Sequence, residues 1–288
     1  MIDLTIEVIE NHKHLTTAEL DADLRKLITS GFTDNPNRFY GNPFLYHYQF
    51  KNLMRCHREN GKTIYDIYND ADAWNKLLAD TLVRNRDGSS DASNVWECYR
   101  INKGSIVMFK SITARYIYNK YGATKVLDPT AGWGGRMLGA WAQGIEYTGI
   151  DTNISMKSAY DDMIAYLETH RCRMLWGDCL QYDFSKIDYD FVLTSPPYVN
   201  MEIYQHMTPW KTPESFYKDF LIPLWHKCWD NIQQPGHICF NISPDMYESA
   251  IKYGMPESDL SEDLKQQLGQ NENKKGQDKI YIWKKNNE

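Results

Sequence analysis

The chain has 288 residues, of which 42% are apolar and 24% charged, and its formal net charge at pH 7 is −6. This composition is typical of a globular protein with a sizeable core, and the charge argues mildly against a protein that coats nucleic acid non-specifically. No stretch approaches the ~18 consecutive apolar residues of a membrane-spanning helix. The N-terminal residues MIDLTIEVIENHKH do not resemble a secretory signal, because they contain acids and lack an apolar segment.

The first 95 residues are predicted to be mainly helical. Apolar residues recur near helical spacing in three segments, residues 18–31, 50–60 and 72–85. Residues 33–50 are aromatic and have the character of a loop, and residues 86–94, RDGSSDASN, have that of a turn-rich linker. We therefore predict a helical N-terminal region over residues 1–95 and a second unit over residues 96–288.

After residue 100, short apolar strands alternate with helices. The expected strands are residues 125–130, 146–151, 172–178, 188–195, 236–243 and 279–285. The expected helices are residues 111–122, 134–144, 153–168 and 213–233. This alternation predicts an α/β fold with a doubly wound, mostly parallel sheet that has helices on both faces. Residues 244–277 are polar and weakly patterned, and we expect a loop or a small lid there.

Positive charge gathers between Arg84 and Lys125, where eight Lys and Arg residues stand against three acids. Aromatic residues are interleaved with these cations, among them Trp96, Tyr99, Phe109, Tyr116 and Tyr118. For any single residue, a solvated helix face beside a core is the commoner explanation. The alternative hypothesis is a local surface that contacts phosphates.

The six cysteines show no CxxC pair, as expected of reduced thiols in a cytoplasmic protein. A zinc site would require distant His partners that the sequence does not indicate. We therefore predict no metal site.

The segment DPTAGWGGR, residues 128–136, follows a predicted strand and begins a predicted helix. Glycines in such a turn let the backbone approach a ligand closely, and N–H groups at a helix start point toward it. A dinucleotide-binding GxGxxG motif is excluded because its third glycine position falls on Met137, and a P-loop because no Gly-Lys-Ser/Thr follows. A turn without a ligand remains the alternative.

Carboxylates end three successive strands. Asp151 follows Asp128 by 23 residues and ends the second strand, where doubly wound nucleotide-binding folds hold ribose hydroxyls. Asp178 ends the third strand. Each carboxylate alone is more often a helix cap or a turn former. Because the carboxyl ends of parallel strands share one edge of the sheet, the three together predict one ligand-binding crevice.

The strand that includes residues 191–194 ends in Ser195, Pro196, Pro197 and Tyr198. Prolines donate no backbone hydrogen bond and fix φ, so the sheet ladder stops there. A tetrapeptide of this kind, taken alone, is explained equally well as a strand-ending turn. Its position downstream of the glycine turn favours a function.

Together, DPTAGWGG and SPPY resemble the S-adenosylmethionine-dependent amino-methyltransferases of the DNA N4-cytosine/N6-adenine group. The resemblance covers roughly residues 105–243, about half of the chain, and SIVMFKSITARYIYNKYG, residues 105–122, resembles the family's additional cofactor-contacting motif. It implies a Rossmann-like methyltransferase fold, S-adenosylmethionine as cofactor and DNA as partner, with RNA as the alternative. The substrate-recognition part is then expected in residues 1–95.

The resemblance also implies which residues bind the cofactor: Phe109, Lys110, Asp128, Thr130, Ala131, Gly132, Gly134, Asp151, Asp178 and Cys179. The chain departs from the family at two positions of the turn. Family members often carry Phe where this chain has Thr130, and Ser or Thr where it has Gly135.

The expected catalytic residues are Ser195, Pro196, Pro197 and Tyr198. An exocyclic amino group is a poor nucleophile because its lone pair is delocalised into the ring. The Ser195 hydroxyl oxygen and the Pro196 carbonyl, held by the diproline, can accept its two N–H bonds and free the lone pair for attack. Tyr198 offers a flat face for a flipped-out base.

Residues 199–213 are expected to form a loop over the site, with Tyr204, His206 and Trp210 as candidate base contacts. Within the family, Ser at the first position of the catalytic motif accompanies cytosine N4 more often than adenine N6, so cytosine is preferred. The alternatives are an adenine N6 enzyme acting on DNA or RNA, a non-catalytic nucleic-acid-binding partner subunit, and a protein glutamine methyltransferase.

Overall fold

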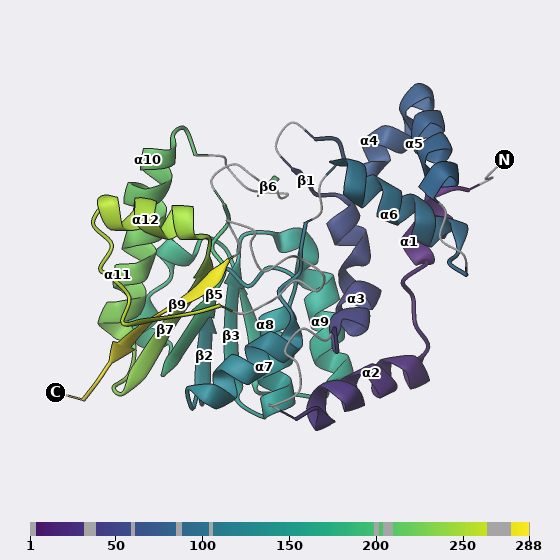
Figure 1. Ribbon diagram of the computed structural model, residues 1–288. Helices are drawn as coiled ribbons and strands as arrows, with labels where there is room; N and C mark the ends of the chain where they lie inside the picture. Colours follow the sequence, from purple (N-terminus) through teal and green to yellow (C-terminus); the bar gives the residue numbers. More distant parts are fainter. Residues whose placement is uncertain are drawn as a thin grey trace.

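A seven-stranded mixed sheet between two layers of helices forms one part of the protein, and a group of N-terminal helices lies to one side of it (Figure 1). The computed structural model describes residues 4–31, 39–58, 61–84, 88–103, 106–198, 202–203, 210–263 and 278–287. Within these residues no helix is long and apolar enough to cross a membrane. The predicted α/β fold with a mostly parallel sheet is confirmed.

The strands of the sheet follow the order β4-β3-β2-β5-β7-β9-β8. In that order they are β4 (Cys172–Trp176), β3 (Glu146–Asp151), β2 (Lys125–Asp128), β5 (Phe191–Thr194), β7 (Gly236–Ile242), β9 (Lys279–Lys285) and β8 (Leu260–Glu262). The first five are parallel, and the last two run antiparallel to their neighbours. The order reverses between β2 and β5, and open α/β sheets bind ligands at the carboxyl ends of strands at such a reversal.

Both faces of the sheet are buried under helices, as continuous apolar strands require. One face carries α7 (Ser111–Lys120), α8 (Gly135–Gln143) and α9 (Lys157–Tyr166), and the other carries α10 (Pro213–Phe216), η4 (Tyr217–Leu221), α11 (Ile222–Asn231) and α12 (Pro244–Lys252). Successive residues of a strand alternate between the two cores: Val126 and Phe191 join the first, and Leu127 and Val192 join the second. Three short 3₁₀ turns follow strand ends or precede strands, namely η1 (Ile154–Met156), η2 (Cys179–Gln181) and η3 (Phe184–Lys186).

The N-terminal region is helical, as predicted, and contacts the sheet unit through two of its helices. Its helices are α1 (Ile6–Asn11), α2 (Thr17–Thr29), α3 (Asn42–Met54), α4 (Ile64–Tyr68), α5 (Ala71–Arg84) and α6 (Asp91–Lys103). Helix α2 packs on α8, and α3 packs on α9 (Figure 1). A two-residue strand β1 (His57–Arg58) pairs antiparallel with β6 (Glu202–Ile203), so the N-terminal region also pairs with the chain just beyond SPPY.

Four predictions of local structure differ from the structure. Residues 33–50 were expected to form a loop, but α3 begins at Asn42 behind Gly41, whose φ is 87°, with a proline in its first turn. These are ordinary helix-start signals, and the many aromatic residues obscured them. The helix expected over residues 50–60 is the last part of α3, which began eight residues earlier than expected and ends at Met54.

The other two differences concern weakly patterned segments. Helix α6 begins at Asp91, inside the predicted linker, so the predicted boundary between residues 95 and 96 falls within a helix. The division of the chain into the regions 1–95 and 96–288 stays a prediction. Residues 244–277 were expected to be a loop or lid, but the structure has α12 and β8 there, and residues 264–277 lie outside the described residues. Ser243 caps α12 by accepting a hydrogen bond from the Met246 N–H.

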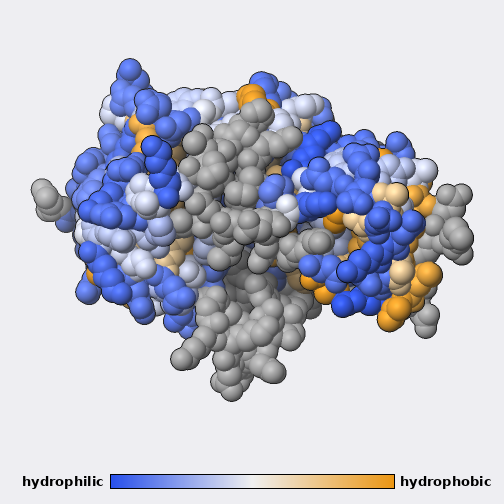
Figure 2. Space-filling model, turned by 90° about the horizontal axis from the view of Figure 1, so that it is seen from above, coloured by the Kyte–Doolittle hydropathy of each residue, from blue (hydrophilic) through white to orange (hydrophobic). Residues whose placement is uncertain are grey.

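The surface seen from above is largely hydrophilic, and apolar colour gathers on the side of the N-terminal helices (Figure 2). Exposed large apolar side chains of that region include Val8, Leu82 and Val83. They lie on α1 and α5, at a distance from the strand ends described below.

Candidate active site

The turn after β2 leads directly into α8. Gly132 and Gly134 have φ values of 58° and 92°, a left-handed conformation that residues with a Cβ rarely adopt. Gly134 is the N-cap of α8. The first N–H groups of that helix have no acceptor within the helix, so the turn offers donors at the carboxyl edge of the sheet.

The segment before α7 lies against the start of α8. A Cβ atom on Gly135 would lie 1.9 Å from the carbonyl oxygen of Phe109, so only glycine permits this approach. The Arg136 guanidinium lies 5.2 Å from the centre of the Phe109 ring. Lys110, the next residue, is buried with its Nζ 4.4 Å from the centre of the Phe39 ring, and burial lowers the pKa of its ammonium to about 8. The structure therefore brings Phe109 to the glycine turn, and a contact between Lys110 and a cofactor stays a prediction.

Asp128 is fully buried and connects four elements. Arg136 Nε donates to its Oδ2 at 2.6 Å, and the Tyr147 hydroxyl donates to the same oxygen at 2.7 Å. Thr194 Oγ1 donates to Oδ1 at 3.0 Å. Arg136 also donates to the Thr130 carbonyl, so the buried ion pair holds the glycine turn in place. A direct contact between Asp128 and a cofactor stays a prediction.

Asp151 lies beside the glycine turn, as the sequence led us to expect. Its Oδ2 accepts the Gly132 N–H at 2.8 Å, and its Oδ1 accepts the Asn153 N–H at 2.9 Å. Burial raises the pKa of Asp151, and these two hydrogen bonds act in the opposite direction. A carboxylate offers about four acceptor positions. Two therefore remain for hydroxyl groups of a ligand.

Asp178 and Cys179 follow the neighbouring strand β4. The Gly177 N–H donates to the Asp151 carbonyl at 2.9 Å, so the ends of β3 and β4 lie side by side. Asp178 is exposed and caps η2 by accepting the Leu180 N–H. Cys179 is buried, and burial raises the pKa of its thiol to about 12, so the thiol is neutral at physiological pH.

SPPY follows β5 on the other side of the reversal in strand order. Thr194 Oγ1 lies 2.6 Å from Thr130 Oγ1, which joins the glycine turn to the residue before Ser195. Ser195 is partly exposed, and its Oγ accepts a hydrogen bond from Asn241 Nδ2 at 3.0 Å. Pro196 is buried, while Pro197 and Tyr198 are partly exposed. The sequence-predicted cofactor turn and catalytic segment thus meet at one point of the sheet edge.

Two further residues at this edge were not predicted from the sequence. Asn241 is a buried polar residue within the apolar strand β7. Asp278 precedes β9, and its carboxyl group lies near enough to the Tyr198 hydroxyl for the two to interact. That interaction lowers the pKa of the Asp278 carboxyl, while burial, the larger effect, raises it. A polar residue inside an otherwise apolar strand is the signal by which Asn241 could have been found.

The predicted loop contacts stay predictions. Tyr204 and His206 lie outside the described residues. The ring of Trp210 packs edge-on against Phe216 at 4.8 Å and beside Phe220 at 5.2 Å. Trp210 therefore belongs to the aromatic packing of α10 and η4.

Within the described residues, much of the basic, aromatic stretch between Arg84 and Lys125 is buried or ion-paired, and a phosphate-contacting surface there stays a hypothesis. Trp96, Tyr99 and Tyr118 are core residues. Arg115 is buried and donates to the carbonyls of Leu27 and Ser30, each at 2.7 Å, which ties α7 to the end of α2. Three other cations of the stretch are in ion pairs: Arg100 with Glu97, Lys120 with Glu262, and Lys125 with Asp188.

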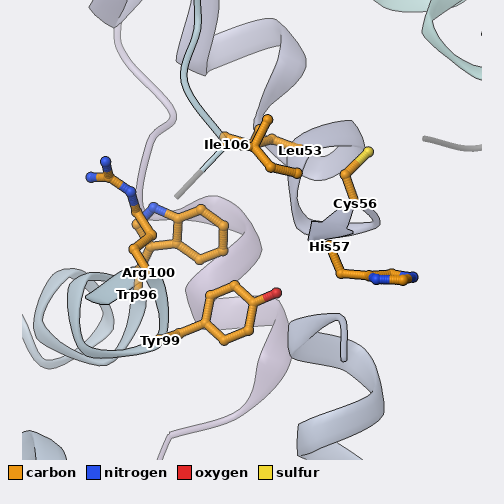
Figure 3. A pocket seen from close by; sticks show the side chains of 7 residues that line it. All are labelled: Leu53, Cys56, His57, Trp96, Tyr99, Arg100 and Ile106. Carbon is orange, nitrogen blue, oxygen red and sulfur yellow. The ribbon is translucent and has the colours of Figure 1, made fainter. Parts of the chain in front are cut away.

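A small cavity lies inside the N-terminal region, beside β1. It is lined by Leu53, Cys56, His57, Trp96, Tyr99, Arg100 and Ile106. The Arg100 guanidinium points away from the other side chains (Figure 3). The volume of the cavity is about 10 Å³, which is room for about one water molecule. The cavity is therefore too small for a base or a nucleoside.

The strand order, with β9 antiparallel between β7 and β8, is that of the class I methyltransferase fold. No protein-family model and no curated protein sequence matches this chain. Among the described residues, no group of three or more His, Cys, Asp or Glu side chains is placed to hold a metal ion.

Several solved structures are similar to part of the chain. An RNA methyltransferase from Salinibacter ruber, in complex with S-adenosyl-L-homocysteine, is 16% identical over 63% of this chain and 95% of that one, with a TM-score of 0.42. TrmN from Thermus thermophilus is 14% identical over 61% of this chain and 48% of that one, with a TM-score of 0.45. An rRNA methylase from Streptococcus thermophilus is 9% identical over 64% of this chain and all of that one, with a TM-score of 0.43.

Proposed function

We propose that the protein transfers a methyl group from S-adenosylmethionine to an exocyclic amino group of a nucleic-acid base, with cytosine N4 in DNA as the preferred target. The contact between Thr130 and Thr194 carries this proposal, because it places the glycine turn and SPPY side by side at the reversal of the sheet. A turn that binds a cofactor and a segment that orients an amino group need this proximity for transfer.

The residues around the glycine turn fit S-adenosylmethionine. The spare acceptor positions of Asp151 suit two ribose hydroxyls. Lys110 follows Phe109 in the chain, and its buried ammonium, 4.4 Å from the centre of the Phe39 ring, suits a carboxylate. Asp178 and Cys179, at the next strand end, would border the adenine. When bound, the cofactor supplies an electrophilic methyl group on a sulfonium.

The chain's own residues prepare the amino group. The Ser195 hydroxyl oxygen and the Pro196 carbonyl would accept its two N–H bonds and draw the nitrogen toward tetrahedral geometry, which frees the lone pair. The diproline keeps that carbonyl fixed. Tyr198 would stack on the base. The surplus proton leaves to water after transfer, so no strong general base is required.

The choice of chemistry is supported by the geometry of the strand ends, whereas the choice of cytosine and of DNA is supported by the family resemblance. Serine at the first position of the motif favours cytosine N4 through the family resemblance alone. Adenine N6, RNA, and a non-catalytic nucleic-acid-binding subunit are the alternatives. Each of them predicts a different product in one assay.

That assay offers tritiated S-adenosylmethionine with duplex DNA, single-stranded DNA and tRNA, followed by digestion to nucleosides. We expect label in N4-methylcytosine from DNA, and a large loss of label for Ser195→Ala with cofactor affinity unchanged. Label in N6-methyladenine would change the proposed base, and label in tRNA would change the proposed nucleic acid. In both cases the proposed methyl transfer to an amino group would stand. A protein that binds the cofactor but labels no DNA, tRNA or protein would be the non-catalytic subunit.

A further inference from the structure

Asn241 lies next to Ser195 because of the strand register. Thr194 of β5 pairs with Phe240 of β7, so the following residues of the two parallel strands are neighbours. Asn241 is only 6% exposed, and its Nδ2 donates to Ser195 Oγ at 3.0 Å. A buried amide costs free energy unless its polar atoms are hydrogen-bonded. Its place within the apolar strand GHICFNI therefore calls for a role.

A serine hydroxyl rotates freely and carries one donor hydrogen and two acceptor lone pairs. The hydrogen bond from Asn241 occupies one lone pair and holds the Ser195 side chain in one rotamer. One lone pair is then left in a fixed direction, and Ser195 is partly exposed at the crevice. Fixed acceptors are what the proposed activation of an amino group requires.

We propose that Asn241 is a positioning residue, which fixes the direction in which Ser195 accepts a hydrogen bond from the substrate amino group. This inference rests on the proposed function and adds to it a group from β7, the strand next to SPPY. Asn241 acts through Ser195 and need not touch the substrate. Strand β7 thereby contributes to the site through Asn241.

The test is Asn241→Leu, which keeps a similar volume and removes the donor. We expect kcat for methyl transfer to fall by about 10- to 100-fold, because a misplaced catalytic group costs up to this factor. The KM for nucleic acid and the Kd for S-adenosylmethionine should stay within about twofold, since neither the base platform nor the glycine turn is altered. A general loss of structure would change all three quantities.

Asn52→Leu is a matched control. Asn52 is also a buried asparagine, and its Nδ2 donates to Gln49 Oε1 at 2.9 Å within α3, in the N-terminal region. Its replacement should lower the melting temperature without a selective loss of kcat. If Asn241→Leu is too unstable to assay, Asn241→Ser, which removes the amide with less change in polarity, is measured in the same way.

A double-mutant cycle in single-turnover assays decides whether Asn241 acts through Ser195. In a Ser195→Ala background, Asn241→Leu should cause no further loss of rate, because the group that it positions is already absent. An unchanged kcat for Asn241→Leu, or losses that multiply in the double variant, would overturn the inference and leave the proposed function standing. A wild-type protein without methyl transfer would overturn both.

Discussion

The hydroxyl oxygens of Thr130 and Thr194 lie 2.6 Å apart and join the two segments of the candidate site. Thr194 donates its only hydroxyl hydrogen to Asp128, so Thr130 must be the donor in the contact between the two threonines. This chain of hydrogen bonds runs from the glycine turn through β5 to a buried carboxylate. It sets the spacing between the predicted cofactor turn and SPPY.

Replacing Thr194 with valine should destabilise the protein. Thr194→Val leaves one oxygen of the buried Asp128 without its hydroxyl donor, and leaving a buried polar group unsatisfied costs about 1–3 kcal/mol. Thr81→Val is the control, since Thr81 is equally buried but donates only to the Leu77 carbonyl within its own helix. Chemical denaturation should show the larger loss of unfolding free energy for Thr194→Val. The reverse order would mean that the Asp128 cluster does not depend on Thr194.

Gly135→Ser, which introduces a residue that the family carries at this position, should disturb cofactor binding in this protein. The new Cβ would meet the Phe109 carbonyl, and relieving such a clash with backbone costs about 1–3 kcal/mol. The displacement would move Phe109 away from the glycine turn, shift Lys110 with it and weaken the affinity for S-adenosylmethionine. Calorimetric titration measures that affinity.

Gly88→Ala is the control for this substitution, because nothing lies within 4 Å of the added Cβ and its cost is backbone strain alone at a φ of 81°. It should lower stability by about 1–2 kcal/mol and leave cofactor affinity unchanged. Equal cofactor affinity for Gly135→Ser and the wild-type protein would show that the Phe109 segment does not contribute to the cofactor site.

Most of the sheet could be predicted from the sequence because short, largely apolar segments alternate with clear helices, but β8 has no such signal. The residues at strand ends could be predicted for the same reason: Asp151 is the last residue of β3 and Ser195 follows β5, and parallel strands bring such residues to one edge. The glycine turn was recognisable by its position between a strand and a helix. The antiparallel direction of β9 carries no comparable local signal.

Contacts between distant strands could not be predicted. Asn241 is 46 residues from Ser195 in sequence, and only the register of β5 against β7 makes them neighbours. For the aromatic residues of the basic stretch, the sequence left two explanations open. Trp96 and Tyr99 alternate with cations in the sequence, which is typical of nucleic-acid surfaces and also of amphipathic helices that bury one face. The packing of α6 against α1 and α5 decides for the second explanation.

Asp151→Asn should weaken the binding of S-adenosylmethionine. The substitution keeps the shape of the side chain but removes the charge and half of its acceptors, and hydrogen bonds to a charged group contribute about 1.5–3 kcal/mol. We therefore expect the Kd to rise by about 10- to 100-fold. Asp183→Asn is the control, because Asp183 also accepts a backbone N–H beside a short turn, at η3. An unchanged Kd for Asp151→Asn would place the ribose hydroxyls elsewhere.

Tyr198 should act through its ring more than through its hydroxyl. Tyr198→Phe keeps the flat face and removes only the hydroxyl near Asp278, so transfer should fall by less than about threefold. Tyr198→Ala removes the stacking platform, which is worth about 1–3 kcal/mol per base, and should reduce kcat/KM for nucleic acid by about 10- to 100-fold. Equal losses for the two variants would assign the function to the hydroxyl and Asp278.

Lys110 should make cofactor affinity depend on pH. Burial lowers the pKa of its ammonium to about 8, so the free protein carries this charge below pH 8 and loses it as the pH rises above 8. A neutral amine cannot attract the carboxylate of S-adenosylmethionine without first taking up a proton. The affinity should therefore be constant below pH 8 and fall by up to about tenfold per pH unit above it.

The comparison with Lys110→Arg isolates this effect from the titration of the cofactor's own amino group, which ionises in the same range. A guanidinium stays charged throughout, so the arginine variant should retain only the pH dependence that the cofactor itself causes. Calorimetric titrations from pH 6.5 to about 9.5 measure the difference in slope. Parallel profiles for the two proteins would mean that Lys110 is not next to the cofactor carboxylate, and that its buried charge serves the packing of α7 alone.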